Sequence, residues 1–251
     1  MEIVVIGSGG ALYSTSHLQS GSCFLLIADW RGKTIKILFD IGEGTLRNAI
    51  AMGIDITGIT VVFISHCHMD HCGGLPFFVH YRHLLAEKNE IALETLHVYG
   101  PVGLKRVFEG SLGLLGDSDF EPDIRFHEGP GETEMARIVE VRHCKDVQSL
   151  AFIYSGGPVQ VIYTGDLNDD PENDQILRAV AVRPVIITDA AENGNICHRG
   201  AFGAAMLGLT CGAQKVILGH VRLGHIEEVD ELCRFSGGRC VRAIDGQTIE
   251  I

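Results

Sequence analysis

Short apolar runs alternate with amphipathic segments along the whole chain. The runs at 2–6, 22–29 and 34–40 are rich in Ile, Val, Leu and Phe, which predicts strands. The segment 76–87 spaces its apolar side chains at helical intervals, so it predicts a helix with one mostly apolar face. The same patterns predict further strands at 59–64, 96–99, 124–126, 137–141, 149–154, 159–164, 185–188 and 216–218, and helices at 102–115, 175–182, 201–212 and 226–235.

This order of elements predicts two strand-rich halves with helices on the outside. The fold class is therefore α/β, with four layers in an αβ/βα sandwich. No Ser- or Pro-rich linker, repeat or low-complexity tract interrupts the chain, so residues 1–251 are predicted to form a single domain.

Composition and charge narrow the class of protein. Of the 251 residues, 46% are hydrophobic and 21% charged, and no apolar run approaches the ~20 residues of a membrane helix. The first strand has no basic segment before it, which argues against a signal peptide and predicts a cytoplasmic protein. The net charge of −12 disfavours a nucleic-acid partner, because nucleic-acid binders usually carry a basic face. A small-molecule substrate is expected instead, and a homodimer is allowed.

The eight cysteines contain no CxxC pair, so they predict neither a zinc knuckle nor a thioredoxin site. Without a signal peptide, reduced thiols are expected. Cys67, Cys72, Cys144 and Cys197 lie in or beside the stretches that carry candidate chemistry. They are interpreted as small apolar core residues, with a redox-sensitive thiol or an additional metal ligand as the open alternative.

The stretch 64–74 concentrates metal-binding chemistry at the end of a buried strand. In an extended segment, side chains two residues apart point the same way, so His66 and His68 can bind one metal ion. Asp70 and His71, in the turn that follows, can face a second ion. Imidazole and carboxylate ligands suit Zn2+, with iron or Mn2+ as alternatives. A polar loop with chance histidines is the disfavoured alternative.

Three more strand ends carry residues of the same kind: His143, Asp166 and His220. The seven side chains fill two sites of three protein ligands with one bridging carboxylate. One ion is assigned to the two histidines of the extended segment together with His143. The other is assigned to Asp70, His71 and His220, and Asp166 is the predicted bridge. A polar loop at 14–17 is expected to be solvated, with a place at the border of the pocket as the alternative.

Asp40 closes the third strand, and Ile41 and a Gly-Glu-Gly turn follow it. It is interpreted as a carboxylate that orients a ligand histidine from behind. The alternative is an acid that caps the helix starting near Thr45.

These motifs together resemble a known family. SHCHMDH matches the HxHxDH signature of the metallo-β-lactamase superfamily, and the other candidate ligands follow in the order of its motifs. LFDIGEGT, VYGP, YTGDL and the closing Asp245-Gly246-Gln247 resemble its ribonuclease Z-like branch. That branch includes transfer-RNA 3′-processing endonucleases and small phosphodiesterases. The resemblance covers essentially the whole chain and implies a metallo-β-lactamase-like sandwich.

The resemblance also implies two catalytic roles beyond metal binding. His198 is similar to the histidine that protonates the leaving group, and Asp189 to the acid that pairs with it. With Asp70, which is also a metal ligand, they are the predicted catalytic residues. Three features depart from the family pattern: the longer run from His143 to Ser149, a Gly before His220, and the missing arm that ribonuclease Z uses to hold transfer RNA.

The predicted function is metal-dependent hydrolysis by a hydroxide that bridges two divalent ions, with Zn2+ expected. A phosphodiesterase acting on a small phosphodiester or cyclic phosphate is the main hypothesis. Hydrolysis of a carboxylic ester, thioester or lactone at the same site is a second hypothesis, because the substrate pocket cannot be deduced from sequence. The third is ribonuclease Z-type RNA processing, and the fourth is a non-catalytic metal-binding module.

Overall fold

The structure is a computed structural model that describes residues 1–10, 20–112, 122–192 and 196–251. The polar loop expected at 14–17 lies outside the described residues, as does the last part of the helix expected at 102–115.

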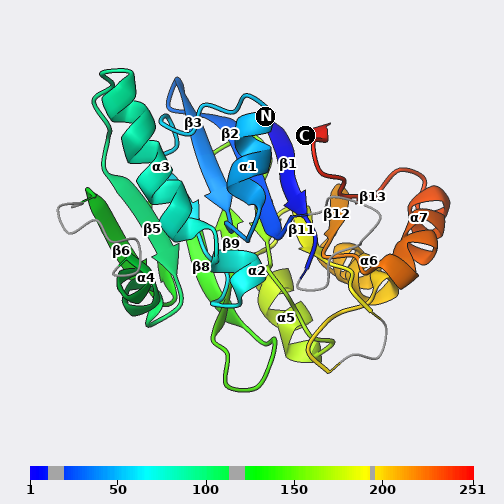
Figure 1. Cartoon of the computed structure of the whole chain (residues 1–251). Helices are drawn as coiled ribbons and strands as arrows, with labels where there is room; N and C mark the ends of the chain where they lie inside the picture. The colour runs from blue at the N-terminus through cyan, green and yellow to red at the C-terminus, as the bar shows by residue number, and fades with distance from the viewer. Residues whose placement is uncertain (11–19, 113–121, 193–195) are drawn as a thin grey trace.

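Two seven-stranded sheets form the centre of the protein (Figure 1). The first sheet has the order β14-β1-β2-β3-β4-β5-β6, with β14 at Thr248–Glu250, β1 at Glu2–Ser8, β2 at Ser22–Trp30, β3 at Lys33–Phe39, β4 at Val61–Phe63, β5 at Leu96–Gly100 and β6 at Ile124–Glu128. The second has the order β13-β12-β11-β10-β9-β8-β7, with β13 at Cys240–Arg242, β12 at Lys215–Gly219, β11 at Val185–Asp189, β10 at Val161–Tyr163, β9 at Ser149–Tyr154, β8 at Ala136–Val141 and β7 at Gly131–Glu132.

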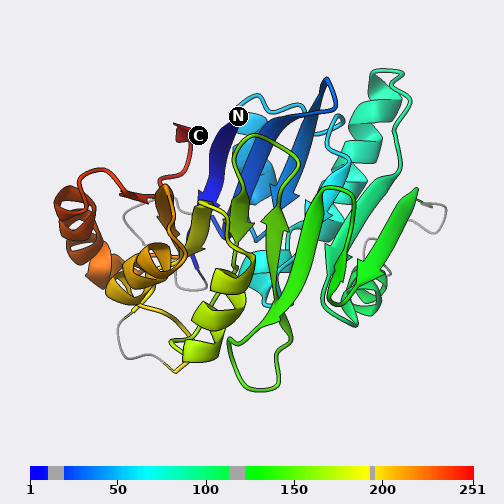
Figure 2. The same ribbon diagram turned by 180° about the vertical axis from the view of Figure 1, so that it is seen from behind.

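Helices cover the outer face of each sheet, as the front and back views show (Figures 1 and 2). The first sheet is covered by α1 (Thr45–Ala51), α3 (Leu75–Lys88) and α4 (Leu104–Leu112), and the second by α5 (Pro171–Val180), α6 (Ala201–Thr210) and α7 (Ile226–Phe235). This arrangement is the predicted four-layer αβ/βα sandwich, which is confirmed.

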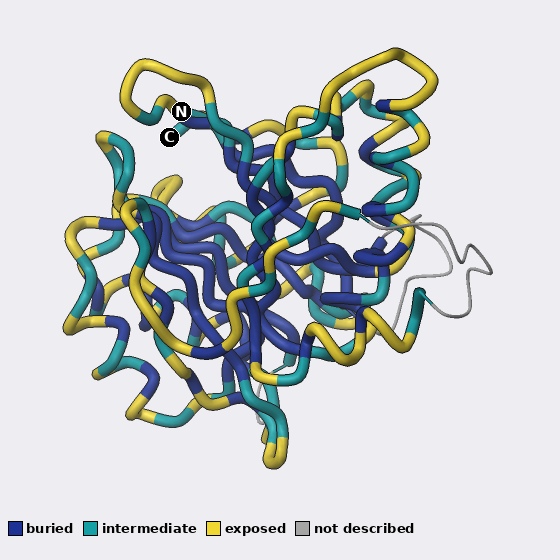
Figure 3. The backbone as a smooth tube through the Cα atoms, turned by 90° about the vertical axis from the view of Figure 1, so that its left-hand side faces the viewer, coloured by how far each residue is buried: buried dark blue, intermediate teal, exposed yellow. Residues whose placement is uncertain are grey.

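Aromatic side chains fill the space between the two sheets. Phe39 and Phe63 point inward from the first sheet, and Phe152 and Tyr163 from the second. The Phe63 and Phe152 ring centroids lie 4.4 Å apart, and those of Phe39 and Tyr163 lie 5.1 Å apart. The inner strands are accordingly buried along most of their length (Figure 3). The two sheets therefore pack face to face through this aromatic layer.

Several element boundaries differ from the prediction for local reasons. The helix expected at 175–182 begins at Pro171, because the Asp170 side chain accepts a hydrogen bond from the Glu172 backbone N–H and caps it. The helix expected at 102–115 begins at Leu104. The strand expected at 159–164 is limited to Val161–Tyr163.

Parallel pairing brings the functional strand ends to one edge. In the first sheet β3, β4 and β5 run parallel, and in the second β10, β11 and β12 do. A hydrogen bond of 2.9 Å from the Leu150 N–H to the Ser65 carbonyl joins the sheets where β4 ends. The edge at the carboxyl ends of these strands is where ligands bind in open α/β sheets.

No helix among the described residues is long and apolar enough to cross a membrane.

Candidate metal centre

His66, His68 and His143 form the first ligand group. His66 and His68 lie in the segment between β4 and α2, where His68 has extended backbone angles, and Nε2 of His66 lies 3.0 Å from Nδ1 of His68. His143 follows β8, and its Nε2 lies 3.5 Å from Nδ1 of His68. Its Nδ1 donates a 2.6 Å hydrogen bond to the Cys197 carbonyl, which leaves Nε2 to face the other two rings. The longer run after His143 therefore does not displace it.

Asp70, His71 and His220 form the second group. Asp70 and His71 lie in α2 (Met69–Cys72), a single helical turn that buries both. His220 follows β12 in a left-handed conformation with φ of 56°, and its backbone N–H donates to the Ser8 carbonyl at 2.8 Å. The Nε2 atom of His220 lies 3.2 Å from Oδ2 of Asp70. The three ligand atoms lie within 4.8 Å of one another.

Asp166 lies between the two groups. Its Oδ2 atom is 3.9 Å from Nε2 of both His66 and His143, 3.4 Å from Nε2 of His71 and 3.3 Å from Nε2 of His220. No described residue gives this buried oxygen, or Nε2 of His71, a hydrogen-bond partner. Buried polar atoms normally have partners, so this arrangement fits divalent cations on both sides of the carboxylate. The structure thus brings all seven predicted ligands together.

Charges around the carboxylate shape its titration. Burial alone raises the pKa of Asp166, but His220, His71 and His66 outweigh burial and hold that pKa well below its usual range. For His143 burial dominates and lowers the pKa to about 4. Asp166 is therefore an anion and His143 a neutral imidazole, which are the forms that bind metal ions. Burial lowers the pKa of His71 and of His220, but the carboxylates around them, led by Asp166, outweigh burial and raise the pKa of both, so a bound metal ion would have to displace protons from these two rings.

Asp40 contacts His71 of the second group at Nδ1, the ring nitrogen that does not face Asp166. It is fully buried, and its Oδ2 atom lies 2.6 Å from Nδ1 of His71. Ser65 donates to the same carboxylate through its backbone N–H at 2.6 Å and its hydroxyl at 2.7 Å, and the Tyr163 hydroxyl donates as well. The capping alternative is excluded, because the N-cap of α1 is Gly44. Ser65 and Tyr163 were not predicted; Ser65 directly precedes the ligand stretch, whereas Tyr163 has the sequence context of an ordinary core residue.

His198 and Asp189 lie beside the cluster. Nδ1 of His198 is 3.4 Å from Oδ2 of Asp189 and 3.4 Å from Oδ2 of Asp166. Asp189 ends β11, and it also accepts hydrogen bonds from the backbone N–H groups of Leu167 and Arg199. His198 could alternatively join His143 and Asp166 as a metal ligand, since the three ligand atoms lie within 4.8 Å of one another.

A cavity of about 610 Å³ opens over this cluster. That volume is typical of small-ligand pockets, which span roughly 300–1,000 Å³. Its lining contains ligand residues together with His198, and adds Glu43, Met69 and Arg222, which were not predicted. Substrate can therefore reach the candidate centre.

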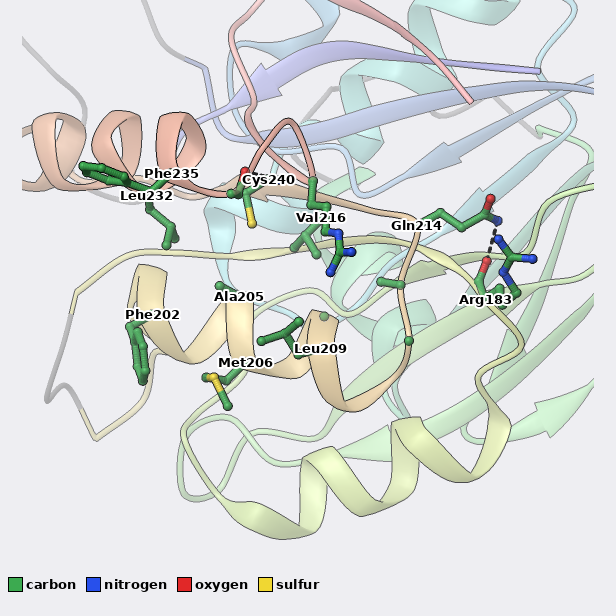
Figure 4. A pocket seen from close by; sticks show the side chains of 15 residues that line it. Arg183, Phe202, Ala205, Met206, Leu209, Gln214, Val216, Leu232, Phe235 and Cys240 are labelled. Atoms are coloured by element: carbon green, nitrogen blue, oxygen red, sulfur yellow. Dashed lines mark hydrogen bonds between the residues drawn. The ribbon is translucent and has the colours of Figure 1, made fainter.

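A second cavity of about 770 Å³ lies between α6 and α7 (Figure 4). Its lining includes Phe202, Met206 and Leu209 from α6 and Leu232 and Phe235 from α7. None of the predicted ligands lines this cavity, so it is separate from the metal centre.

Comparison with known proteins agrees with this geometry. Residues 18–206 match the family model of the metallo-beta-lactamase superfamily. The chain belongs to this superfamily. Ribonuclease Z of Streptococcus equi subsp. equi is 34% identical over 140 residues, which cover 56% of this chain and 43% of the relative. Ribonuclease Z of Pyrococcus abyssi is 34% identical over 137 residues, covering 54% and 40%. The chain thus spans less than half the length of these curated relatives.

Solved superfamily structures share the fold at low sequence identity. Human tRNase Z, short form, aligns with a TM-score of 0.77 at 20% identity and covers 100% of this chain and 99% of its own. A diphosphatase from the PhnP family aligns with a TM-score of 0.71 at 16% identity, covering 100% and 96%. The predicted resemblance to the ribonuclease Z-like branch is confirmed.

The relatives contradict one expectation drawn from charge. A small-molecule substrate was expected and a nucleic-acid partner disfavoured, yet the curated relatives are named as ribonucleases and a solved neighbour as a tRNase. The net charge of −12 is summed over the whole surface, whereas a substrate contacts only the part of the surface around the centre. Cations bound there would supply the local positive charge. The expectation drawn from the net charge is therefore wrong as a guide to the substrate class of the relatives.

The four cysteines near the centre lie outside the ligand groups. Cys72 is buried, and Cys67, Cys144 and Cys197 are half-buried. Sγ of Cys144 lies 3.4 Å from Nε2 of His143. Among the described residues, no group of three or more potential ligands contains a cysteine. The core interpretation and the redox alternative stay predictions.

Proposed function

We propose that this chain is a metal-dependent phosphodiesterase that binds two divalent ions at the candidate centre. Zn2+ is the metal that we expect first. The observation that carries the proposal is the position of the Asp166 Oδ2 atom, within 3.9 Å of imidazole nitrogens from both ligand groups. His66, His68 and His143 would hold one ion, Asp70, His71 and His220 the other, and Asp166 both. Ions bound there would lower the pKa of a shared water and offset charge on a phosphoryl oxygen.

The protein's own residues supply positioning and a proton. Asp40 fixes the ring of His71 by contacting Nδ1, so that Nε2 faces the centre. The Cys197 carbonyl fixes His143 in the same way. His198 lines the cavity, and Asp189 lies 3.4 Å from its Nδ1 atom. That contact leaves Nε2 of His198 to give a proton to the departing oxygen of the substrate.

Phosphorus is favoured over carbon as the atom attacked because of the relatives. The curated relatives are named ribonuclease Z, and a solved neighbour is described as a diphosphatase. An RNA phosphodiester is therefore tested beside a small phosphodiester such as bis-nitrophenyl phosphate. Nitrophenyl acetate and a lactone test the hypothesis of carboxylic ester hydrolysis. Two bound ions without hydrolysis of any of these substrates would favour the non-catalytic module.

The role of His198 is tested with leaving groups of different basicity. In His198→Ala, turnover of a phosphodiester with an alkoxide leaving group is expected to fall far more than turnover of one that releases nitrophenolate. Only the alkoxide needs a proton in order to leave. Equal losses on both substrates would reject the proton-donor role. His83→Ala, a histidine on α3 paired with Glu87, serves as the control.

A further inference from the structure

We propose that Arg222 binds the negatively charged phosphoryl group of the substrate and makes the site select anionic phosphodiesters over neutral esters. This inference rests on the proposed function and deepens it. It assigns substrate selection to a side chain outside the metal ligands.

The position of Arg222 is the first argument. It lines the cavity over the centre and lies two residues after His220 on the loop that follows β12. The described residues that line this cavity include three acids, Glu43, Asp70 and Asp166, and one basic side chain of the Lys/Arg type, Arg222. A phosphodiester entering the cavity therefore meets carboxylates on several sides and this one guanidinium.

The partner of Arg222 is the second argument. Nη1 of Arg222 forms an ion pair with Oε2 of Glu192, which lies just beyond the end of β11. The two side chains are 32% and 36% exposed, so water screens the pair and opening it costs little. A guanidinium has five N–H donors, and the ion pair engages Nη1 only. Arg222 can therefore exchange Glu192 for an incoming anion at little cost, and its other N–H donors are not engaged by Glu192.

The chemistry of the substrates gives the third argument. A phosphodiester carries one negative charge with two equivalent oxygens, which match the planar fork of an arginine. A carboxylic ester or a lactone carries no charge and gains little from that fork. Arg222 would therefore separate substrates that the metal ions alone would attack alike.

The test compares one charged and one neutral substrate. Arg222→Gln is expected to lower kcat/KM for bis-nitrophenyl phosphate by about 10- to 100-fold, as expected for a lost charged hydrogen bond. The value for nitrophenyl acetate should change by less than about threefold, since no such bond is lost. Arg222→Lys keeps the charge and should retain part of the activity. Arg234→Gln, on exposed α7 and paired with Glu231, is the matched control and should change neither.

A charge swap separates substrate binding from a structural ion pair. Arg222→Glu combined with Glu192→Arg restores the pair but moves the positive charge away from position 222. If Arg222 binds substrate, the swapped protein should remain impaired on the phosphodiester. Recovery to the wild-type value would show that the ion pair alone matters and would overturn the inference.

A binding measurement keeps this inference separate from the proposed function. If wild-type protein hydrolyses no phosphodiester, the proposed function fails, and titration calorimetry of inorganic phosphate with metal-loaded protein still tests Arg222. Phosphate should bind about 10-fold or more weakly to Arg222→Gln than to wild type. Equal affinities, or equal losses on the charged and neutral substrates, would overturn the role of Arg222.

Discussion

Replacing Asp40 by Asn should weaken metal binding without touching a metal ligand. Asp40 contacts Nδ1 of His71 and accepts hydrogen bonds from Ser65 and Tyr163 in a fully buried site. Its φ of 57° is left-handed, a conformation that Asn adopts readily. Asn therefore keeps the size and the backbone but replaces one accepting oxygen by an NH2 donor. At least one buried donor must then lose its acceptor, at about 1–3 kcal/mol.

The magnitude for metal affinity follows from the contact to His71. Loss of an outer hydrogen-bond partner typically lowers metal affinity by about 10- to 100-fold. That range corresponds to about 1.4–2.7 kcal/mol. The dissociation constants of both ions are measured by competition with a chromogenic chelator. Urea unfolding of the metal-free proteins measures the separate effect on stability.

The control is Asp55→Asn, an exposed acid paired with Lys36, which should leave metal affinity unchanged. If Asp40→Asn binds both ions as tightly as wild type, or loses only stability of the metal-free form, the reasoning about Asp40 and His71 is refuted.

Three further predictions concern the centre itself. In metal-free protein, burial holds the pKa of His143 at about 4, below the ~6.5 of an unfolded chain, so the unfolded state binds more protons between these values and stability falls as pH drops through that window. Urea unfolding should show that the free energy of unfolding of wild type falls by about 3 kcal/mol more than that of His143→Gln between pH 7 and pH 4. Parallel plots of the free energy of unfolding against pH for the two proteins would contradict this. Gly10→Ala places a Cβ 2.3 Å from the His220 ring and should weaken metal binding in the chelator assay, whereas Gly110→Ala meets no atom within 4 Å and should not; equal affinities would argue against this contact. Removing the metals with a chelator should lower the free energy of unfolding by about 2.7 kcal/mol for each site that was filled at 100 times its dissociation constant, and an unchanged melting temperature would be inconsistent with bound ions.

The sequence predicted the centre well because its signals are local. His66, His68, Asp70 and His71 lie within six consecutive positions, and the geometry of one extended segment and one turn determines how they point. His143, Asp166 and His220 each follow a strand, and strand ends gather at one edge of their sheets. Neither step requires knowledge of side-chain packing.

The residues that sequence reasoning missed depend on contacts between distant segments. Tyr163 lies in an apolar run and looks like core, yet its hydroxyl reaches Asp40, 123 positions away. Arg222 is a candidate because it lines the cavity and pairs with Glu192. Neither contact can be deduced from the sequence. The early start of α5 is different, because Asp170 before Pro171 is a recognisable capping signal that the apolar pattern concealed.

The central claim is that seven side chains hold two cations on either side of Asp166. The most direct test is the metal content of purified, metal-reconstituted protein. It is measured by inductively coupled plasma mass spectrometry and by calorimetric titration. We predict two divalent ions per chain in wild type and at most one tightly bound ion in His220→Gln. A single ion per chain in wild type, or two tightly held ions in His220→Gln, would contradict the account.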